Sequence, residues 1–154
     1  MKKSLPFILG LLTIAIDQLV KQWALGALGG GERIELLGSF LSLRLVFNSG
    51  AAFSLGNSMT WVITAIAAVV SVGLPVVIAR SAQVPAIILG FVWGGAVGNL
   101  IDRLFREPGF PSGHVVDMID YNGYFVGNVA DIALVVGVVA LLAYGFGRTP
   151  EKTQ

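Results

Sequence analysis

The chain has no cysteine and only one histidine, His114. Without cysteine, disulfides, a thiolate nucleophile and a cysteine-ligated zinc site are all excluded. Charged residues are also scarce, at 12% of the sequence against about 25% in a typical soluble domain. Because the formal net charge is only +1, we expect no strong electrostatic attraction to nucleic acid.

Apolar residues take the place of the missing charge. They make up 55% of the sequence, and the mean hydropathy is +0.82. A membrane-spanning helix needs about 20 predominantly apolar residues, and four segments qualify: 5–28, 59–79, 84–100 and 124–146. Pro75 lies inside the second, where neighbouring helices can satisfy the carbonyl that it frees. The sequence therefore predicts an all-α membrane protein with four transmembrane helices, forming one domain over residues 1–154.

The first span also resembles a secretory signal peptide, since two lysines precede an apolar run. However, the apolar region of a signal peptide is about 7–15 residues long and uncharged. This segment continues through Asp17 and Lys21. We therefore predict a retained helix.

The distribution of basic residues predicts the orientation. Basic residues in short segments beside the spans mark the cytoplasmic side. Such residues occur near both termini and in the short connection between the second and third spans: Lys2, Lys3, Arg80, Arg148 and Lys152. Those in or near the longer connections are more widely spread: Lys21, Arg33, Arg44, Arg103 and Arg106. We predict cytoplasmic termini, with outer segments at 29–58 and 101–123.

The first outer segment contains a strand pattern. Between residues 39 and 48, Leu41, Leu43, Leu45 and Phe47 alternate mainly with polar residues. A period of two is typical of a half-buried strand. The fold prediction therefore includes a small extracytoplasmic β-sheet or amphipathic segment.

Two ionisable residues lie within the first span. An ionisable side chain at the bilayer centre costs about 2.5–3.5 kcal/mol on insertion scales, so it normally faces the bundle interior and has a partner. Asp17 and Lys21 are four residues apart, which places them on one helix face. They are expected to form a structural ion pair.

A second polar stripe ends the third span. Gly95, Asn99 and Arg103 recur every four residues. Gly94, Gly95 and Gly98 are typical of a helix-packing face. The amide and the guanidinium need acceptors at that depth, and Asp102 or another carboxylate is expected to supply them.

A third polar group combines the second outer segment with the fourth span. Asn128 and Asp131 are one turn apart, and Asp117 follows two β-branched residues. A short loop returning to the membrane would bring the carboxylates of Asp117 and Asp131 together. Two adjacent carboxylates share one proton: the ionised one can activate water while the other polarises a carbonyl.

Five blocks in order carry a family resemblance: residues 17–21, 48–53, 94–103, 115–117 and 128–131. Together they resemble the lipoprotein signal peptidases, or signal peptidase II. The resemblance implies that Asp117 and Asp131 form a catalytic dyad. It also implies residues that position substrate or brace the dyad: Asp17, Lys21, Asn48, Gly50, Gly95, Asn99, Arg103, Asn128 and Ala130.

The resemblance further implies an activity and a location. Family members are intramembrane aspartic endopeptidases that remove signal peptides from bacterial prolipoproteins. They cleave just before a diacylglyceryl-modified cysteine, use no metal or other cofactor, and are inhibited by globomycin. It implies a plasma-membrane protein with its site near the outer leaflet, an outer sheet over residues 32–57 and membrane lipid as a partner. We expect a monomer.

The polar residues also allow four other functional interpretations. His114 belongs to a Pro-Ser-Gly-His block shared with membrane phosphatases, but their chemistry needs a second histidine. A divalent metal could be bound by His114, Asp117 and Asp120. If the protein is instead an aspartic protease, we expect Asp120 to be a solvated loop carboxylate. A proton-coupled transporter could use Asp17, Lys21, Asp102 and Asp131 as a relay. A purely structural membrane subunit is the last alternative.

Overall fold

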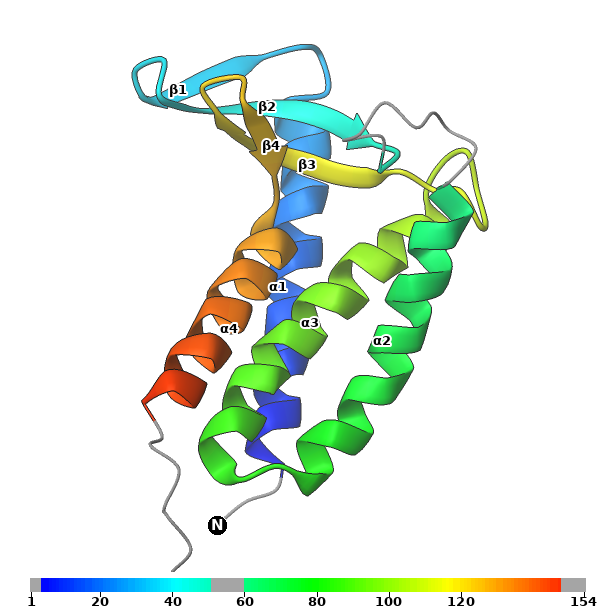
Figure 1. The fold of residues 1–154 in the computed structure, drawn as a ribbon. Coiled ribbons are helices and arrows are strands. Elements are labelled where there is room, and N and C mark those ends of the chain that lie inside the picture. Colours follow the sequence, from blue (N-terminus) through cyan, green and yellow to red (C-terminus); the bar gives the residue numbers. More distant parts are fainter. Residues whose placement is uncertain (1–3, 51–59, 148–154) are drawn as a thin grey trace, which may run out of the picture.

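The computed structural model describes residues 4–50 and 60–147. In these residues four helices form a bundle, and a small sheet covers one end of it (Figure 1). The helices are α1 (Leu5–Ala27), α2 (Thr60–Arg80), α3 (Gln83–Phe105) and α4 (Val129–Phe146). Each is long and apolar enough to cross a membrane, which confirms the four predicted spans.

Two boundaries differ from the prediction. Helix α3 continues to Phe105 rather than ending at residue 100, so Asp102 and Arg103 are helical instead of belonging to the outer segment. Helix α4 begins at Val129 rather than residue 124, because Phe125–Gly127 forms a strand. Hydropathy cannot distinguish a short apolar strand from the first turn of an apolar helix.

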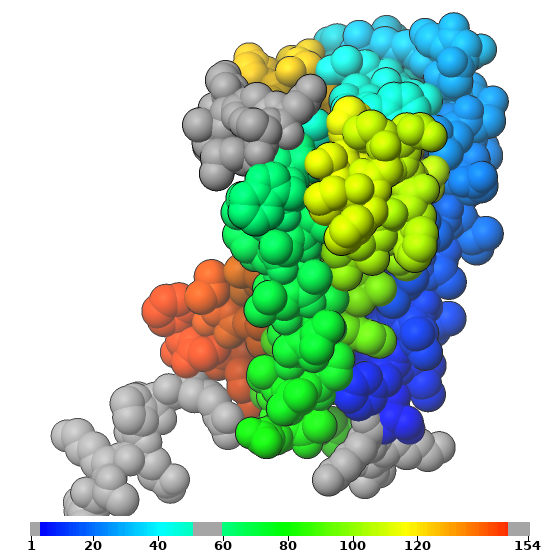
Figure 2. All heavy atoms as spheres, turned by 90° about the vertical axis from the view of Figure 1, so that its right-hand side faces the viewer, coloured from blue at the N-terminus to red at the C-terminus, as the bar shows by residue number. Residues whose placement is uncertain are grey.

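The sheet is built from both outer segments. Its strands are β1 (Arg33–Leu37), β2 (Leu41–Asn48), β3 (Val115–Tyr121) and β4 (Phe125–Gly127), and all neighbours are antiparallel in the order β1-β2-β3-β4. The predicted strand within residues 39–48 is confirmed as β2. Strands β3 and β4 were missed. Figure 2 shows the loop that follows α3 lying directly below the sheet.

The sheet is anchored on the C-terminal end of α1. Ala24 and Leu28 form a buried cluster with Val116 and Met118 of β3. Successive side chains of a strand point to opposite faces. Burying Val116 and Met118 against α1 therefore directs Asp117, which lies between them, to the other face. The hydrophobic contact thus fixes where a carboxylate of the predicted dyad points.

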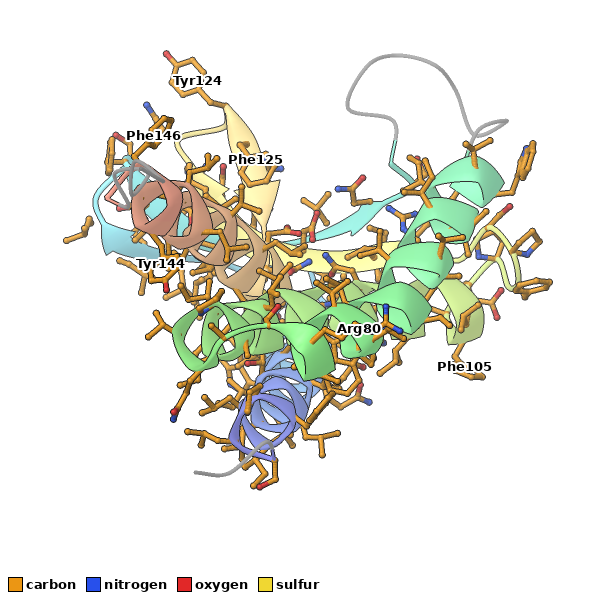
Figure 3. All side chains as sticks on the ribbon, turned by 60° about the horizontal axis from the view of Figure 1, so that its bottom comes forward. Arg80, Phe105, Tyr124, Phe125, Tyr144 and Phe146 are labelled. Carbon is orange, nitrogen blue, oxygen red and sulfur yellow. The ribbon has the colours of Figure 1, made fainter. Side chains whose placement is uncertain are left out.

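Glycines allow α3 to pack closely against its neighbours, and Figure 3 shows α1, α2 and α4 arranged around it. A Cβ at Gly90 would lie 2.3 Å from the Pro6 carbonyl oxygen, and one at Gly95 would lie 2.6 Å from the Ala130 carbonyl oxygen. Neither backbone can move away without separating the helices. The predicted packing face of the third span is confirmed.

Pro75 illustrates how the bundle satisfies a broken helix. Proline has no N–H to donate to the carbonyl four residues earlier, which here belongs to Ser71. The indole Nε1–H of Trp93 on α3 donates to the Ser71 oxygen at 2.9 Å. The expectation that a neighbour satisfies this carbonyl is confirmed.

Some predictions lie outside the described residues. They concern Lys2, Lys3, Arg148 and Lys152, as well as residues 51–58 of the first outer segment. The orientation of the termini therefore stays a prediction.

Candidate active site

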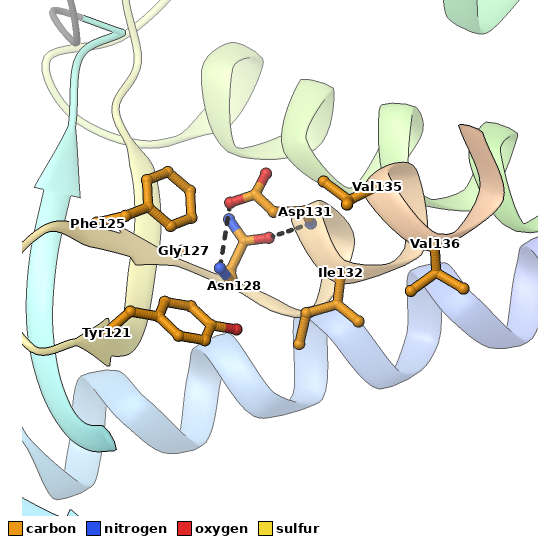
Figure 4. Close-up of a pocket in the computed structure, with 8 residues that line it drawn as sticks. All are labelled: Tyr121, Phe125, Gly127, Asn128, Asp131, Ile132, Val135 and Val136. Atoms are coloured by element: carbon orange, nitrogen blue, oxygen red, sulfur yellow. Dashed lines mark hydrogen bonds between the residues drawn. The ribbon is translucent and has the colours of Figure 1, made fainter. Parts of the chain in front are cut away.

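Asn128 occupies the junction between β4 and α4. Its extended backbone (φ −139°, ψ −175°) ends the strand and caps the helix. The Asp131 N–H donates to the Asn128 side-chain oxygen at 2.9 Å, and the Asn128 N–H donates to Asp131 Oδ2 at 3.2 Å (Figure 4). This reciprocal pair is a capping box. The one-turn spacing seen in the sequence therefore both starts the helix and fixes the Asp131 carboxylate.

Asp117 approaches the same asparagine from β3. Its side chain is 1% exposed. Asn128 Nδ2 donates to Asp117 Oδ1 at 2.6 Å, and Asn48 Nδ2 donates to Asp117 Oδ2 at 2.8 Å. Asn128 therefore bridges Asp117 and Asp131, and the two residues are brought together as predicted. The connection between them is the β3–β4 hairpin, whose turn uses positive φ angles at Asn122 and Gly123.

Asn99 of α3 holds the other side of Asp131. Its Nδ2 donates to Asp131 Oδ1 at 2.8 Å. Its Oδ1 accepts from Asn128 Nδ2 at 3.1 Å and from Lys21 Nζ at 2.9 Å. Because an ammonium can only donate, Lys21 requires the oxygen of the Asn99 amide on its side. The amide nitrogen is thereby left facing Asp131.

Lys21 lies at the centre of an ionic cluster that it forms with Asp17, Asp102 and Arg106. Its Nζ lies 2.8 Å from Asp17 Oδ2 and 2.9 Å from Asp102 Oδ2, and all three side chains have no exposed area. Arg106 Nε adds a contact of 2.7 Å to Asp102 Oδ1. The predicted Asp17–Lys21 pair is confirmed. Asp102 accepts from Lys21 and Arg106, while Asn99 uses Asp131 as its acceptor.

Asp17 also ties α1 to the start of α4. Its Oδ1 accepts from the Ala130 N–H at 2.9 Å. Ala130 is fully buried, and its carbonyl faces Gly95. The ionic cluster therefore positions the same turn that carries Asp131.

Arg103 supplies a cation near both carboxylates. Its side chain is buried, and its charge interacts with those of Asp117, Asp131 and Asp102. Within residues 4–50 and 60–147, its buried Nη1 has no hydrogen-bond partner.

Gly50 lies beside the Arg103 guanidinium. A Cβ at Gly50 would be 3.4 Å from Arg103 Nη2 and only 2.5 Å from a methyl group of Ile63. The backbone there has φ +90°, a conformation that favours glycine. The Gly50 N–H also donates to Asn48 Oδ1 at 2.7 Å, so this turn orients the amide that holds Asp117.

The surroundings of Asp117 make its ionisation unfavourable. Burial raises the pKa of Asp117 to about 6, against the hydrogen bonds from Asn48 and Asn128, which lower it. The negative charge of Asp131 raises it further, and the positive charge of Lys21 lowers it. A carboxyl group that titrates near neutral pH is suited to both accepting and donating a proton.

The prediction for Asp120 was wrong. It is not a solvated loop residue: it lies in β3 and is 1% exposed. Arg44 Nε and the Gly123 N–H each donate to it at 2.7 Å. Burial raises the pKa of Asp120, but the hydrogen bond from Arg44 and the other interactions outweigh it and leave the pKa below its usual value. Sequence reasoning could not foresee the pairing because it depends on the β2–β3 register.

The proposed metal set does not assemble. Asp117 and Asp120 are held by different partners, Asn48 and Asn128 for the first and Arg44 for the second. Across the described part of the chain, no three His, Cys, Asp or Glu side chains are grouped so that they could hold a metal ion.

Sequence reasoning missed Gln18. Its Nε2 lies within 3.2 Å of Asp17 Oδ2 and Asp102 Oδ1 and donates to the Gly98 carbonyl at 3.0 Å. Arg106 was likewise used only to predict orientation. The available signal for Gln18 was an amide inside an apolar span, directly beside Asp17.

Comparisons with known proteins agree with the predicted family. A profile for the family described as signal peptidase (SPase) II matches residues 9–146. A lipoprotein signal peptidase of Rhodococcus jostii is 41% identical over 99% of this chain and 78% of its own length. One from Bifidobacterium adolescentis is 43% identical over 91% of this chain and 75% of its own. A solved bacterial membrane enzyme, 26% identical, superposes over 97% of this chain and 92% of its own with a TM-score of 0.77.

Proposed function

Because the chain belongs to the signal peptidase II family, we propose that it is an aspartic endopeptidase of the bacterial plasma membrane. Its substrates are prolipoproteins, from which it removes the signal peptide. Cleavage occurs just before the diacylglyceryl-modified cysteine, and Asp117 and Asp131 act together on the scissile bond.

A single observation carries this proposal. Asn128 is bonded to both carboxylates, through Nδ2 to Asp117 and through the capping box to Asp131. One carboxylate comes from the sheet and the other from the first turn of α4. Two carboxyl groups gathered at the outer end of a bundle, with neutral amides as their nearest partners, suit general acid and base chemistry on a peptide bond.

The reaction would begin with one proton on the pair. The ionised carboxylate takes a proton from water, and the water oxygen attacks the carbonyl carbon. The protonated carboxyl donates its proton to the carbonyl oxygen, which gives a gem-diol. As the gem-diol collapses, one of its hydroxyl protons passes to the carboxylate that is now ionised, and the other carboxyl donates its proton to the departing nitrogen as the C–N bond breaks. Neither aspartate is assigned the initial proton, because two coupled groups titrate as a unit.

The surrounding residues have separate roles in this proposal. Asn48, Asn99 and Asn128 orient the carboxylates through the hydrogen bonds described above. Arg103 has a guanidinium N–H without a partner in the described residues, which can donate to a carbonyl of the bound peptide. Gly50 leaves room beside that guanidinium.

The proposal includes a placement in the membrane. Both termini are cytoplasmic, and the sheet lies at the outer leaflet, where secreted prolipoproteins are accessible. The enzyme acts as a monomer, without a metal or other cofactor.

The test is cleavage of a defined substrate by the purified chain. One peptide with the cleavage region of a prolipoprotein carries a diacylglyceryl-modified cysteine, and its matched control carries the unmodified cysteine. We expect cleavage of the first alone, immediately before the cysteine by mass spectrometry, with the same rate in excess EDTA. Loss of activity in EDTA would contradict the aspartic mechanism, and cleavage at another bond would contradict the proposed specificity.

A further inference from the structure

An apolar groove of about 430 Å³ begins at the candidate active site and runs along α4 (Figure 4). Asn128 and Asp131 form its polar end. Ile132, Val135 and Val136 form the remaining wall on α4. All three are exposed in the bundle, so the groove opens toward the surrounding lipid.

Two aromatic rings of the β3–β4 hairpin cover the outer end of this groove. Tyr121 and Phe125 are stacked with ring centroids 6.0 Å apart and planes 25° apart. Gly127 makes this placement possible, since a Cβ there would lie 2.7 Å from Phe125 Cε1 and 3.1 Å from Asp131 Oδ2. The hairpin thus forms a roof directly beside the candidate catalytic carboxylate.

A second groove of similar size, about 420 Å³, is lined by residues of α1, α3 and α4. Thr13, Ile88 and Phe91 are among its lining residues, and neither Asn128 nor Asp131 lines it. An occupant of that groove has no contact with the candidate dyad. Of these two grooves in the described residues, the first is continuous with the site.

The chemistry of the first groove indicates what it can hold. An extended peptide segment placed along Ile132, Val135 and Val136 would leave its N–H and C=O groups without hydrogen-bond partners, which is unfavourable in lipid. A helix is about 10–12 Å across and satisfies its own backbone polar groups. In this groove, however, it would place only side chains against α4 and could not extend its backbone to Asp131. A hydrocarbon chain needs no hydrogen bonds and can begin at a polar glyceryl linkage beside the scissile bond.

We infer that this groove is the subsite for one acyl chain of the lipid-modified cysteine, with Val135 setting its width under the roof of Tyr121 and Phe125. The inference rests on the proposed function. The diacylglyceryl group is joined to the cysteine that follows the scissile bond, so its chains must leave the site within a few bonds of Asp131. The groove supplies an apolar path from that point into the bilayer.

The experiment compares Val135→Phe with the parent enzyme on two substrates that share one peptide. One carries two palmitoyl chains and the other two octanoyl chains. Narrowing the groove should raise KM for the palmitoyl substrate about tenfold, equivalent to the burial of about two methylene groups, with little change in kcat. The octanoyl substrate should be affected several-fold less. Phe125→Ala removes part of the roof. It should likewise raise KM for the palmitoyl substrate more than KM for the octanoyl substrate.

Val72→Phe is the matched control because it adds the same bulk to an exposed position on α2 that lines neither groove. Equal KM values for Val135→Phe and the parent on both substrates would overturn the acyl subsite while leaving the proposed function intact. A similar loss in Val72→Phe would also overturn it. Failure of the parent to cleave either substrate would instead overturn the proposed function and this inference with it.

Discussion

Two neighbouring groups of carboxylates in this molecule differ in the charge of their partners. Asp17 and Asp102 are bonded to the cations of Lys21 and Arg106. Asp117 and Asp131 accept instead from neutral amide and backbone N–H groups. A cation stabilises the ionised form strongly, whereas a neutral donor orients a carboxylate and adds less stabilisation. The first group is therefore suited to hold structure and the second to exchange a proton.

The two groups are connected through one amide. Lys21 donates to Asn99, and Asn99 donates to Asp131. Asp17 meanwhile accepts from the Ala130 N–H in the turn that carries Asp131. A fixed ionic cluster therefore orients a site whose own protonation can change. The variants below test this division by removing groups from one side or the other, and the last one applies it to a carboxylate outside both groups.

The largest effect is expected on activity, from Asp131→Asn and Asp117→Asn. Each change keeps the side-chain shape but removes a proton-exchanging group, so kcat on a lipidated substrate should fall about a thousandfold or more. Asp102→Asn is the matched control from the ionic cluster and should keep measurable turnover with a lower melting temperature. Near-parental turnover in either dyad variant would contradict the proton-exchanging role proposed for that carboxylate.

The next effect is expected on stability, from Lys21→Met. The substitution leaves Asp17 and Asp102 buried without their shared cation, and breaking a buried ion pair costs about 3–5 kcal/mol. Unfolding in detergent should show this loss at neutral pH. Adding Asp102→Asn to Lys21→Met should recover part of it, because one unpaired charge is removed. An unchanged melting temperature for the single variant would mean that Lys21 is not the centre of the cluster.

A third effect concerns the pH dependence of stability. The folded protein raises the pKa of Asp117 from 3.8 to about 6, so the contribution of this group to folding is fully present below about pH 4 and is lost as pH rises through 6. The loss corresponds to about 3 kcal/mol at neutral pH. Asp117→Asn cannot ionise there, so its stability relative to the parent should improve between pH 4 and 8. Melting temperatures across that range measure the difference.

A relative stability that falls or stays level across that range would contradict the raised pKa. Asn48→Ala gives an independent check of sign. It removes a hydrogen bond that lowers the Asp117 pKa, so the midpoint of the carboxyl titration should move to higher pH. Infrared titration of the protonated carboxyl would report that shift directly.

The sequence predicted much of this comparison because membrane spans restrict where polar groups can go. The four helices follow from apolar length, and the pairing of Asp17 with Lys21 follows from helical spacing. Asp117 and Asp131 were expected to meet through a short loop returning to the membrane, and the family resemblance added Asn99 as a residue that braces them. Such residues are informative because a polar group without a partner is costly in lipid.

The remaining features depend on tertiary structure that no local pattern specifies. The strands β3 and β4 were missed because β3 was assigned to the outer segment and the short apolar β4 to the start of the fourth span. Asp120 was misjudged because its partner, Arg44, lies on β2 and meets it only through the sheet register. Asn128 was expected to face the same way as Asp131, but its bond to Asp117 requires the return of the β3–β4 hairpin.

The smallest effect is expected from Asp120→Asn, which extends the comparison to a carboxylate with solvent-exposed cationic partners. Arg44 and Arg33 are 40% and 47% exposed, so water can replace much of their interaction. The pKa of Asp120 is lowered in the fold, hence its contribution to stability is present above its ordinary pKa and is lost as pH falls through the folded value. The melting temperature should therefore drop slightly at neutral pH and match the parent in acid. Asp120 contacts neither Asp117 nor Asn128 among the described hydrogen bonds, so kcat/KM of Asp120→Asn should equal that of the parent. A large fall in kcat/KM would contradict this prediction and favour a metal-binding role for Asp120.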